Sequence, residues 1–411
     1  MRLTSSAVCA WPWVPMSRLR IVVGGFAGLL PAGGVTWDYL QYPLGFLLMG
    51  HDVYYVEDTR LWPNYQVSAD GLPDCSTNVA YLDRVSRQFG LGERWSYRDE
   101  VTGSWFGLSQ TRVSEILRTA DVFINVSAAT TLSDDYLRIP ARVMIDSDPM
   151  FTQIQFLNAE GFTPEALGMW TAVRTHTHHF TFGEAIGRSG CRIPSTGVRW
   201  HPTRQPICLD QWTPSPPPES EAGFTTVMNW SAARRLEWGG ESWGQKDIEF
   251  EKIVRLPTRF RSRSLSVAMG QTGGHDFPIE RLTGNGWQII DPAHHVATPD
   301  SYRHFIECSL GEFSVAKETY VKAKTGWFSC RSACYLATGR PVVTQDTGWS
   351  ALLPSDEGLI AFTDLDGAVD ALERVSGNPQ RHGRRAREIA EEFFDSRRVL
   401  GRLLQTIGVA G

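Results

Sequence analysis

The sequence predicts an α/β protein made of two doubly wound domains, each with a parallel sheet. Segments typical of strands alternate with amphipathic helical segments along both halves of the chain, as in parallel α/β domains. The chain has 411 residues, more than one ordinary core holds. A proline-rich stretch, residues 206–223, separates the two alternating series and is typical of a linker.

The first alternating series predicts a domain over residues 16–205. A β-branched run at 18–23 predicts its first strand, and the glycine-rich loop GGFAGLLPAGG follows. The next segment predicts a helix, because apolar residues recur at spacings of three and four from Tyr39 to Met49. HDVYYVEDT predicts the second strand, which completes a βαβ unit. Further strands are expected at 120–126, 142–146 and 179–182, and helices at 81–91 and 113–120.

The second alternating series predicts a domain over residues 224–390. It begins with the strand-like run FTTVMNW. Further strands are expected at 265–269, 287–290, 312–315, 341–344 and 359–362. Helices are expected at 301–309, 331–339, 365–377 and 379–408.

Composition narrows the possible partners. The net charge is −5, whereas a general nucleic-acid binder usually has a basic footprint, so no nucleic-acid partner is expected. No apolar run reaches the roughly 20 residues that cross a bilayer, so no integral membrane segment is expected. The seven cysteines are scattered without a CxxC pair, which favours a reducing, cytoplasmic location. A homodimer stays open.

Residues 1–15 are a separate case. Pro12 and Pro15 interrupt their short apolar patch, and Met16 stands just before the first strand. We expect this stretch to be a disordered or non-native extension that results from an upstream start codon.

The most informative stretch is GEFSVAKETYVKAKTGWFSCRSACYLATGRPVVTQDTG, residues 311–348. A turn opens a helix near Arg331, with Ser329 as its candidate N-cap and Ser332 close behind. Free amides and the helix dipole make this end favourable for an anion, and the Arg331 guanidinium suits phosphate oxygens. The following strand ends at the carboxyl edge of its sheet, where open α/β sheets bind ligands. That edge carries Asp346, Thr347 and Gly348.

Three segments resemble one known group. ACYLATGRPVVTQDTG resembles the donor-domain segment of glycosyltransferases of the GT-B superfamily. GGVTWDYLQYPLGFLLMGHDVYYVEDT resembles the opening of the same superfamily, and RRAREIAEEFFDSRRVLGRLL resembles its closing helices. The resemblance implies the GT-B fold, in which two Rossmann-like domains face each other across a cleft. It also implies that residues 391–411 form a helix that packs back toward the first domain.

The resemblance further implies a function. The second domain would bind a nucleotide-diphosphate sugar, and the first would bind a small-molecule or glycan acceptor of bacterial biosynthesis through a hydroxyl. Hexosyl transfer would need no metal and no cofactor, because a helix end and basic side chains stabilise the leaving diphosphate. Two departures leave donor and stereochemistry open. Cys334 stands where many retaining members have a ribose-binding glutamate, and the turn lacks the histidine of the phosphate loop of inverting members.

Three further residues are candidate donor ligands. Asn229 ends the first strand of the second domain, and Lys317 follows a later strand at a carboxyl edge. Lys246 lies in WGQKDIEF, where members of the superfamily often place a contact to the diphosphate. Each lysine has the alternative of a solvated surface charge, and Arg331 that of a buried ion pair.

The acceptor candidates lie in the first domain. Gly25 and Gly34 flank the loop after the first strand and permit close approach of the backbone to a ligand. Thr36 and Asp38 at the start of the next helix could bind acceptor hydroxyls, and Asp38 is a candidate base. Glu57 ends the second strand and could contact the acceptor. The alternatives are a dipole interaction for Asp38 and a solvated strand end for Glu57.

The histidines of HTHHFTFGE, residues 176–184, suggest a metal hypothesis. A His-x-His pair in a strand puts two imidazoles on one face, but no third ligand follows, so no metal site is expected. His179 is the second candidate base of the cleft.

Two other functions stay open. GGFAG and Glu57 imitate the fingerprint of an NAD-dependent oxidoreductase, although GxGxxG is absent and about ten residues, Pro31 among them, precede the helix. A non-catalytic nucleotide-sugar-binding protein of the same architecture is the other alternative.

Overall fold

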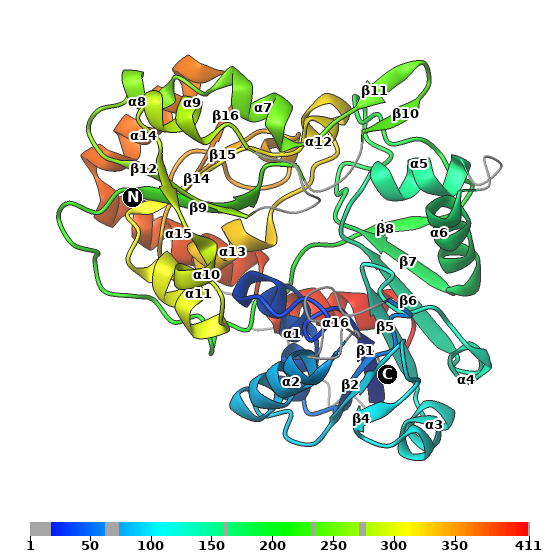
Figure 1. The fold of residues 1–411 in the computed structure, drawn as a ribbon. Helices are drawn as coiled ribbons and strands as arrows, with labels where there is room; N and C mark the ends of the chain where they lie inside the picture. The colour runs from blue at the N-terminus through cyan, green and yellow to red at the C-terminus, as the bar shows by residue number, and fades with distance from the viewer. Residues whose placement is uncertain (1–17, 62–73, 159–162, 232–234, 271–276, 410–411) are drawn as a thin grey trace, which may run out of the picture.

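The structure is a computed structural model in which two α/β domains each surround one large sheet (Figure 1). This arrangement confirms the predicted fold class. The expected extension at 1–15 lies outside the described residues. The structure describes residues 18–61, 74–158, 163–231, 235–270 and 277–409.

The N-terminal domain has an eight-stranded sheet within the described ranges, in the order β4-β3-β2-β1-β5-β6-β7-β8. All neighbours are parallel except β3 and β4. Ile21 and Val23 of β1 belong to one core cluster and Val22 to another, so both faces of the sheet are covered. The strands are β1 (Arg20–Gly24), β2 (Asp52–Glu57), β3 (Trp95–Arg98), β4 (Trp105–Gly107), β5 (Val122–Val126), β6 (Ala141–Asp146), β7 (His178–Thr181) and β8 (Trp200–Pro202).

Helix α1 (Gly33–Leu48) is buried over most of its surface, because it packs on its own sheet and also on elements from the second half of the chain. The other helices of this domain are α2 (Ser76–Gln88), α3 (Gln110–Arg118), α4 (Asp134–Leu137), α5 (Phe151–Leu157) and α6 (Pro164–Thr175). Of these, α2 and α3 are more amphipathic than α1, with one buried face.

The C-terminal domain has a six-stranded parallel sheet in the part of the chain that is described, in the order β13-β12-β9-β14-β15-β16. Counted along the domain, this is the 3-2-1-4-5-6 order of the Rossmann fold. A hairpin of β10 (Leu236–Trp238) and β11 (Glu241–Trp243) follows the first strand. The sheet strands are β9 (Phe224–Asn229), β12 (Leu265–Gly270), β13 (Gln288–Ile290), β14 (Gly311–Ser314), β15 (Val342–Gln345) and β16 (Leu359–Phe362).

Helices connect these strands as in other doubly wound sheets. The short 3-10 helix η2 (Trp349–Ala351) follows β15. The helices are α7 (Lys246–Lys252), α8 (Leu256–Arg259), α9 (Ile279–Gly284), α10 (Pro292–His295), α11 (Pro299–Glu307), α12 (Glu318–Ala323), α13 (Cys330–Ala337), α14 (Leu365–Gly377), α15 (Pro379–Phe393) and α16 (Ser396–Thr406).

The chain crosses between the domains twice. It leaves the first sheet after β8, and it returns between α15 and α16, so that α16 lies against α1 (Figure 1). At the return, the Ile207 amide donates to the Phe394 carbonyl (2.7 Å) and the Ser396 amide donates to the Ile207 carbonyl (2.9 Å). These bonds tie the two crossings together.

The structure corrects two expectations about elements. The helix expected over 379–408 is broken at Phe394 and Asp395, where the backbone pairs with Ile207 and the Asp395 side chain caps α16. The β10–β11 hairpin was not predicted, because its short strands contain no β-branched run.

A pair of glycines tests the docking of α16. A Cβ at Gly45 of α1 would lie 2.5 Å from Leu400 Cδ1 and 3.0 Å from Ser396 Cβ, and both neighbours are fully buried. We expect Gly45→Ala to lower the free energy of unfolding by roughly 1–3 kcal/mol through overpacking. Gly401→Ala in α16 is the control, because nothing lies within 4 Å of its Cβ. Helix propensity predicts a gain of up to about 1 kcal/mol there. Urea unfolding measures both, and equal effects would contradict the close packing.

Candidate functional site

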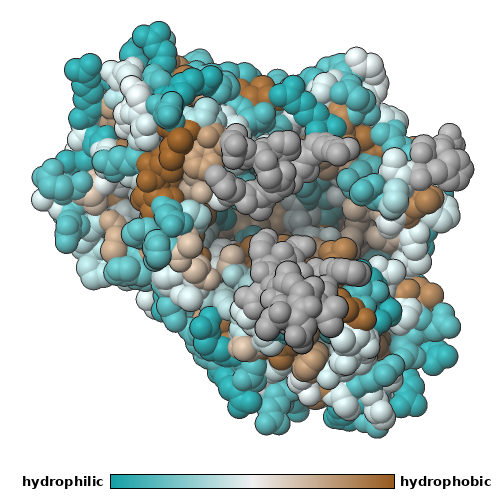
Figure 2. All heavy atoms as spheres, viewed as in Figure 1, coloured by the Kyte–Doolittle hydropathy of each residue, from teal (hydrophilic) through white to brown (hydrophobic). Residues whose placement is uncertain are grey.

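Each sheet has one point at which the strand order reverses: between β1 and β5 in the first domain, and between β9 and β14 in the second. Ligands of open α/β sheets bind outside the carboxyl ends of the strands at such points. The two carboxyl edges face each other, because residues after β6 contact residues after β14. Figure 2 shows the surface hollowed between the two domains at this place.

Helix α13 points its N-terminus at this cleft. Ser329 is the N-cap, as predicted, but its side chain makes no capping bond. Within the described chain, the amides of Cys330, Arg331 and Ser332 have no backbone or side-chain acceptor. These amides and the positive end of the helix dipole can therefore bind an anion.

Arg331 contributes less to anion binding than its sequence position predicts. Its Nε donates to Glu312 Oε1 (2.5 Å) and its Nη1 to the Val227 carbonyl (2.6 Å), and its side chain is only 11% exposed. The guanidinium thus ties α13 to β14 and β9, which corrects the prediction of a free fork for phosphate. Ser332 is also fully buried, so its hydroxyl does not line the cleft.

Lys246 is the uncompensated cation of the site. It begins α7, and its ammonium makes no hydrogen bond or ion pair with any residue in the described ranges. Burial lowers the pKa of Lys246 to about 7, and the nearby charges of Arg331 and Lys317 lower it further. A half-buried ammonium without an ion-pair partner costs free energy unless a ligand neutralises it, so this position favours an anion.

Lys317 is paired across the cleft. Its Nζ lies 2.7 Å from Asp148 Oδ2 and over the rings of Phe151 and Tyr320, at 4.7 and 5.3 Å from their centroids. The Tyr320 hydroxyl donates to the same carboxylate. Lys317 and Tyr320 belong to the second domain, and Asp148 and Phe151 to the first.

Asp38 lies in α1, close enough to α13 for the charge of Arg331 to act on its carboxyl. Its backbone carbonyl accepts a hydrogen bond from Gln205 Nε2 (3.0 Å), and Gln205 Oε1 accepts one from the Cys330 thiol (3.2 Å). Burial raises the pKa of Asp38 to about 7, although the charges of Arg331 and Lys246 act in the opposite direction. A carboxyl that titrates near neutral pH at a cleft is suited to accept a proton.

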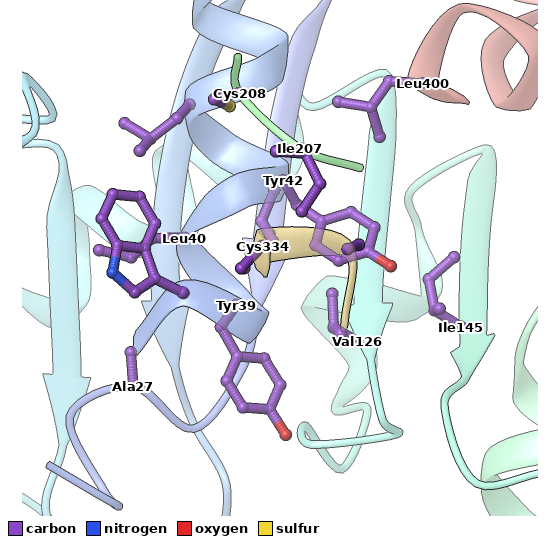
Figure 3. Close-up of a cluster of buried hydrophobic side chains, with 14 of the residues drawn as sticks. Ala27, Tyr39, Leu40, Tyr42, Val126, Ile145, Ile207, Cys208, Cys334 and Leu400 are labelled. Atoms are coloured by element: carbon purple, nitrogen blue, oxygen red, sulfur yellow. The ribbon is translucent and has the colours of Figure 1, made fainter. Parts of the chain in front are cut away.

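Cys334, one turn after Cys330, lies where α13 packs against α1. It is 2% exposed and lies among apolar side chains of the first domain, beside Tyr42 and Val126 (Figure 3). A small side chain lets the two helices approach closely, as a glutamate at this position would not.

Four of the predicted first-domain residues do not line the cleft. Glu57 is 1% exposed and accepts bonds from the amides of Gly28 (2.6 Å) and Leu29 (2.8 Å), so it holds the loop after β1 in place. Thr36 is fully buried with its hydroxyl 2.6 Å from that of Tyr81. These contacts correct the acceptor assignments of Glu57 and Thr36.

The glycine predictions need a similar correction. Gly34 packs against the Tyr302 ring of α11, which lies 3.1 Å from where its Cβ would be. Gly25 packs against Tyr39 and the Tyr55 hydroxyl, which would lie 2.6 and 2.7 Å from a Cβ. Both glycines allow close packing of protein on protein rather than of backbone on a ligand.

His179 is also wrong as a base of the cleft. It lies in β7, with Nε2 2.7 Å from the Val173 carbonyl and its ring against Trp200. Burial lowers its pKa. The residues that are described contain no group of three or more His, Cys, Asp or Glu side chains that could hold a metal ion.

The loop after β15 is held by its own side chains. Asp346 accepts bonds from the Gly348 amide (2.8 Å) and the Ser350 hydroxyl (2.6 Å), and Gly348 has a φ of 95°, which favours glycine. Thr347 donates to the Trp327 carbonyl (2.6 Å). The three residues shape the turn before α13, and Asn229 stays half-buried at the switch point.

The run DSDPMFTQ, residues 146–153, follows a strand and could line the cleft from the sequence alone, but the sequence assigns Asp148 no role there. Only the fold shows that Asp146 is enclosed by hydrogen bonds while Asp148 reaches the other domain.

These features define the fold class as GT-B: two Rossmann-like domains with facing carboxyl edges and a final helix that returns to the first domain. No protein-family model matches the chain, and no curated protein sequence is significantly similar to it. Within the described ranges, no helix is long and apolar enough to span a membrane.

Solved structures with this fold cover nearly the whole chain. An α-glucosyltransferase in complex with UDP and a 13-mer DNA containing a central A:G mismatch is 12% identical, with a TM-score of 0.55 over 95% of this chain and 100% of that one. Sucrose-phosphate synthase from Thermosynechococcus elongatus gives 12% and 0.54 over 95% and 99%. HepE of Anabaena in complex with UDP and glucose gives 11% and 0.52 over 95% and 99%.

The raised pKa of Asp38 makes stability depend on pH. The ordinary value is 3.8, so between about pH 4 and pH 7 the folded chain keeps a proton that the unfolded chain has lost. The stability that this proton contributes is lost as the pH rises through about 7. We expect Asp38→Asn to gain stability relative to wild type over this window and to keep a constant difference above it.

Urea unfolding of both proteins at a series of pH values measures this difference, in which all other titrating groups cancel. A difference that does not change with pH would show that the Asp38 carboxyl has its ordinary pKa.

Proposed function

We propose that the protein is a glycosyltransferase that moves a sugar from a nucleotide-diphosphate donor to a hydroxyl of a small-molecule or glycan acceptor. The observation that carries this proposal is the unpaired ammonium of Lys246 beside the free amides of α13, at the switch point of the second sheet. The GT-B fold supports it, because the solved proteins of similar fold include an α-glucosyltransferase in complex with UDP and HepE in complex with UDP and glucose.

The diphosphate would lie between the α13 N-terminus and Lys246. Negative charge develops on the leaving diphosphate as the bond from the anomeric carbon to its oxygen breaks. Lys246, the free amides and the one unbonded nitrogen of Arg331 stabilise that charge, so we propose transfer without a metal or cofactor. Asn229, Ser329 and Lys317 stand around this position as further donor contacts.

Asp38 would act on the acceptor. The acceptor oxygen forms a bond to the anomeric carbon and gives its proton to the Asp38 carboxylate. A pKa near 7 lets the carboxyl be ionised before the step and protonated after it. Gln205 links the two sides here, because it donates to the Asp38 backbone carbonyl and accepts from the Cys330 thiol of α13.

The connections after the first strands disfavour an NAD-dependent oxidoreductase. A dinucleotide fold needs a tight turn from the first strand straight into a helix that receives the pyrophosphate. Here β9 ends at Asn229 and α7 begins at Lys246, with the β10–β11 hairpin between them. In the first domain, eight residues, 25–32, separate β1 from α1. Neither connection forms that turn.

Lys246 provides the test of donor binding. We expect Lys246→Met to weaken binding of the best-bound of UDP, GDP and dTDP roughly 10- to 100-fold, because it removes a charge-assisted contact of about 1.5–3 kcal/mol. The control is Lys252→Met, which removes the same charge from the exposed end of α7. Equal affinities of the two variants, by calorimetry, would remove Lys246 from the donor site.

Proton uptake on ligand binding provides a second test of Lys246. At pH 8 a group whose pKa is about 7 is mostly neutral, so a bound diphosphate should draw about one proton onto Lys246. Calorimetry in two buffers of different ionisation enthalpy measures this uptake, which Lys246→Met should abolish.

Asp38 provides the test of turnover. We expect Asp38→Asn to lower the rate of transfer, or of donor hydrolysis in water, by about 10²–10⁴-fold while nucleoside-diphosphate binding persists. Undiminished turnover would exclude Asp38 as the base. Binding without any turnover in the wild type would favour the non-catalytic alternative.

A further inference from the structure

Asp148 lies at the cleft, in the loop that follows β6. Asp146, at the end of β6, accepts bonds from the Asp148 amide (3.0 Å), the Thr152 hydroxyl (2.6 Å), Gln153 Nε2 (2.8 Å) and the Thr181 hydroxyl (2.7 Å). These four bonds use both oxygens of Asp146 and fix the start of the loop. The backbone that carries Asp148 is therefore held by the fold of its own domain.

The second domain holds the same carboxylate without enclosing it. Lys317 and Tyr320 each donate one bond to it, which leaves about two of the four acceptor positions of a carboxylate free. The Asp148 side chain is 43% exposed, whereas that of Lys317 is 16% exposed. An anchored carboxylate with free lone pairs toward a cleft can accept hydrogen bonds from hydroxyls of a ligand.

The surroundings of Asp148 fit a sugar ring. The Trp327 ring stacks on Tyr320 at 4.5 Å, and its indole nitrogen donates to the Ser147 carbonyl (3.1 Å), so a flat apolar surface borders the carboxylate. The hydroxyls of Ser147 and Ser127 lie 2.6 Å apart on the same wall. The charge of Asp148 raises the pKa of Lys246, so the two side chains are close together. Asp148 therefore lies next to the position proposed for the diphosphate.

We propose that Asp148 binds hydroxyl groups of the sugar carried by the donor and thereby determines which sugar is transferred. This inference rests on the proposed function. A carboxylate close to a diphosphate repels it, and it stabilises the complex only where hydroxyls of the ligand donate hydrogen bonds to it. Asp148 would therefore favour binding of a nucleotide sugar over binding of a bare nucleoside diphosphate.

The experiment compares the two kinds of ligand by calorimetry. Each nucleoside diphosphate is paired with its sugar form: UDP with UDP-glucose, GDP with GDP-mannose, and dTDP with dTDP-glucose. We expect Asp148→Asn and Asp148→Ala to raise the ratio of the Kd for the sugar form to the Kd for the bare form about tenfold or more in the best-bound pair. The affinity for the bare diphosphate should stay equal or increase, because a repelling charge is gone.

Tyr320→Phe is the matched control, because it removes an interdomain hydrogen bond to Asp148 but keeps the carboxylate and the aromatic ring. If Asp148 acts only as a link between the domains, the aspartate variants will leave the ratio unchanged, as Tyr320→Phe does, and the inference is overturned. If the wild type binds none of the nucleoside diphosphates, the proposed function itself fails. Circular dichroism and the melting temperature show that each variant is folded.

Discussion

The cleft depends on a balance of charge between its two walls. The wall of the second domain carries Lys317, Arg331 and the positive end of α13, and among the described residues Glu312 pairs with Arg331. The first domain supplies Asp148, whose carboxylate pairs with Lys317 across the cleft. This ion pair attracts the two walls to each other in the ligand-free protein, whereas Asp38 and Lys246, with pKa values of about 7, carry only part of their charge near neutral pH.

Apolar packing fixes the distance at which this balance acts. Helix α1 contacts α11, α13 and α16, all of which come from the second half of the chain. The contact with α11 is close enough that a Cβ at Gly33 would lie 2.2 Å from the Thr298 carbonyl oxygen. Cys334 allows α13 an equally close approach on the other side. These packing contacts determine how far apart the two walls lie, and therefore the distance between the charged groups that the walls carry.

The sequence predicts the fold well, because hydrophobic periodicity and the order of strands and helices are local properties. It also predicts which residues stand at carboxyl edges, and Asp38, Lys246 and Lys317 do lie around one cleft. It cannot show what each side chain meets there. Glu57 and Asp38 both stand near carboxyl edges, yet loop amides enclose Glu57 and the other domain faces Asp38. Only the tertiary fold separates these two environments.

The same argument assigns different roles to the two strongest cations of the site. Arg331 is already neutralised by Glu312 and fixed to the Val227 carbonyl, so an incoming anion gains less from it than from a free guanidinium. Lys246 has no such partner in the described chain and carries the cost of its burial as a lowered pKa. An entering diphosphate would remove that cost by restoring the proton, and the added charge would be balanced without breaking any bond of the resting protein. In the sequence, Lys246 on its short helix is a less evident anion ligand than Arg331. Its protonation is nevertheless what a bound diphosphate would change most.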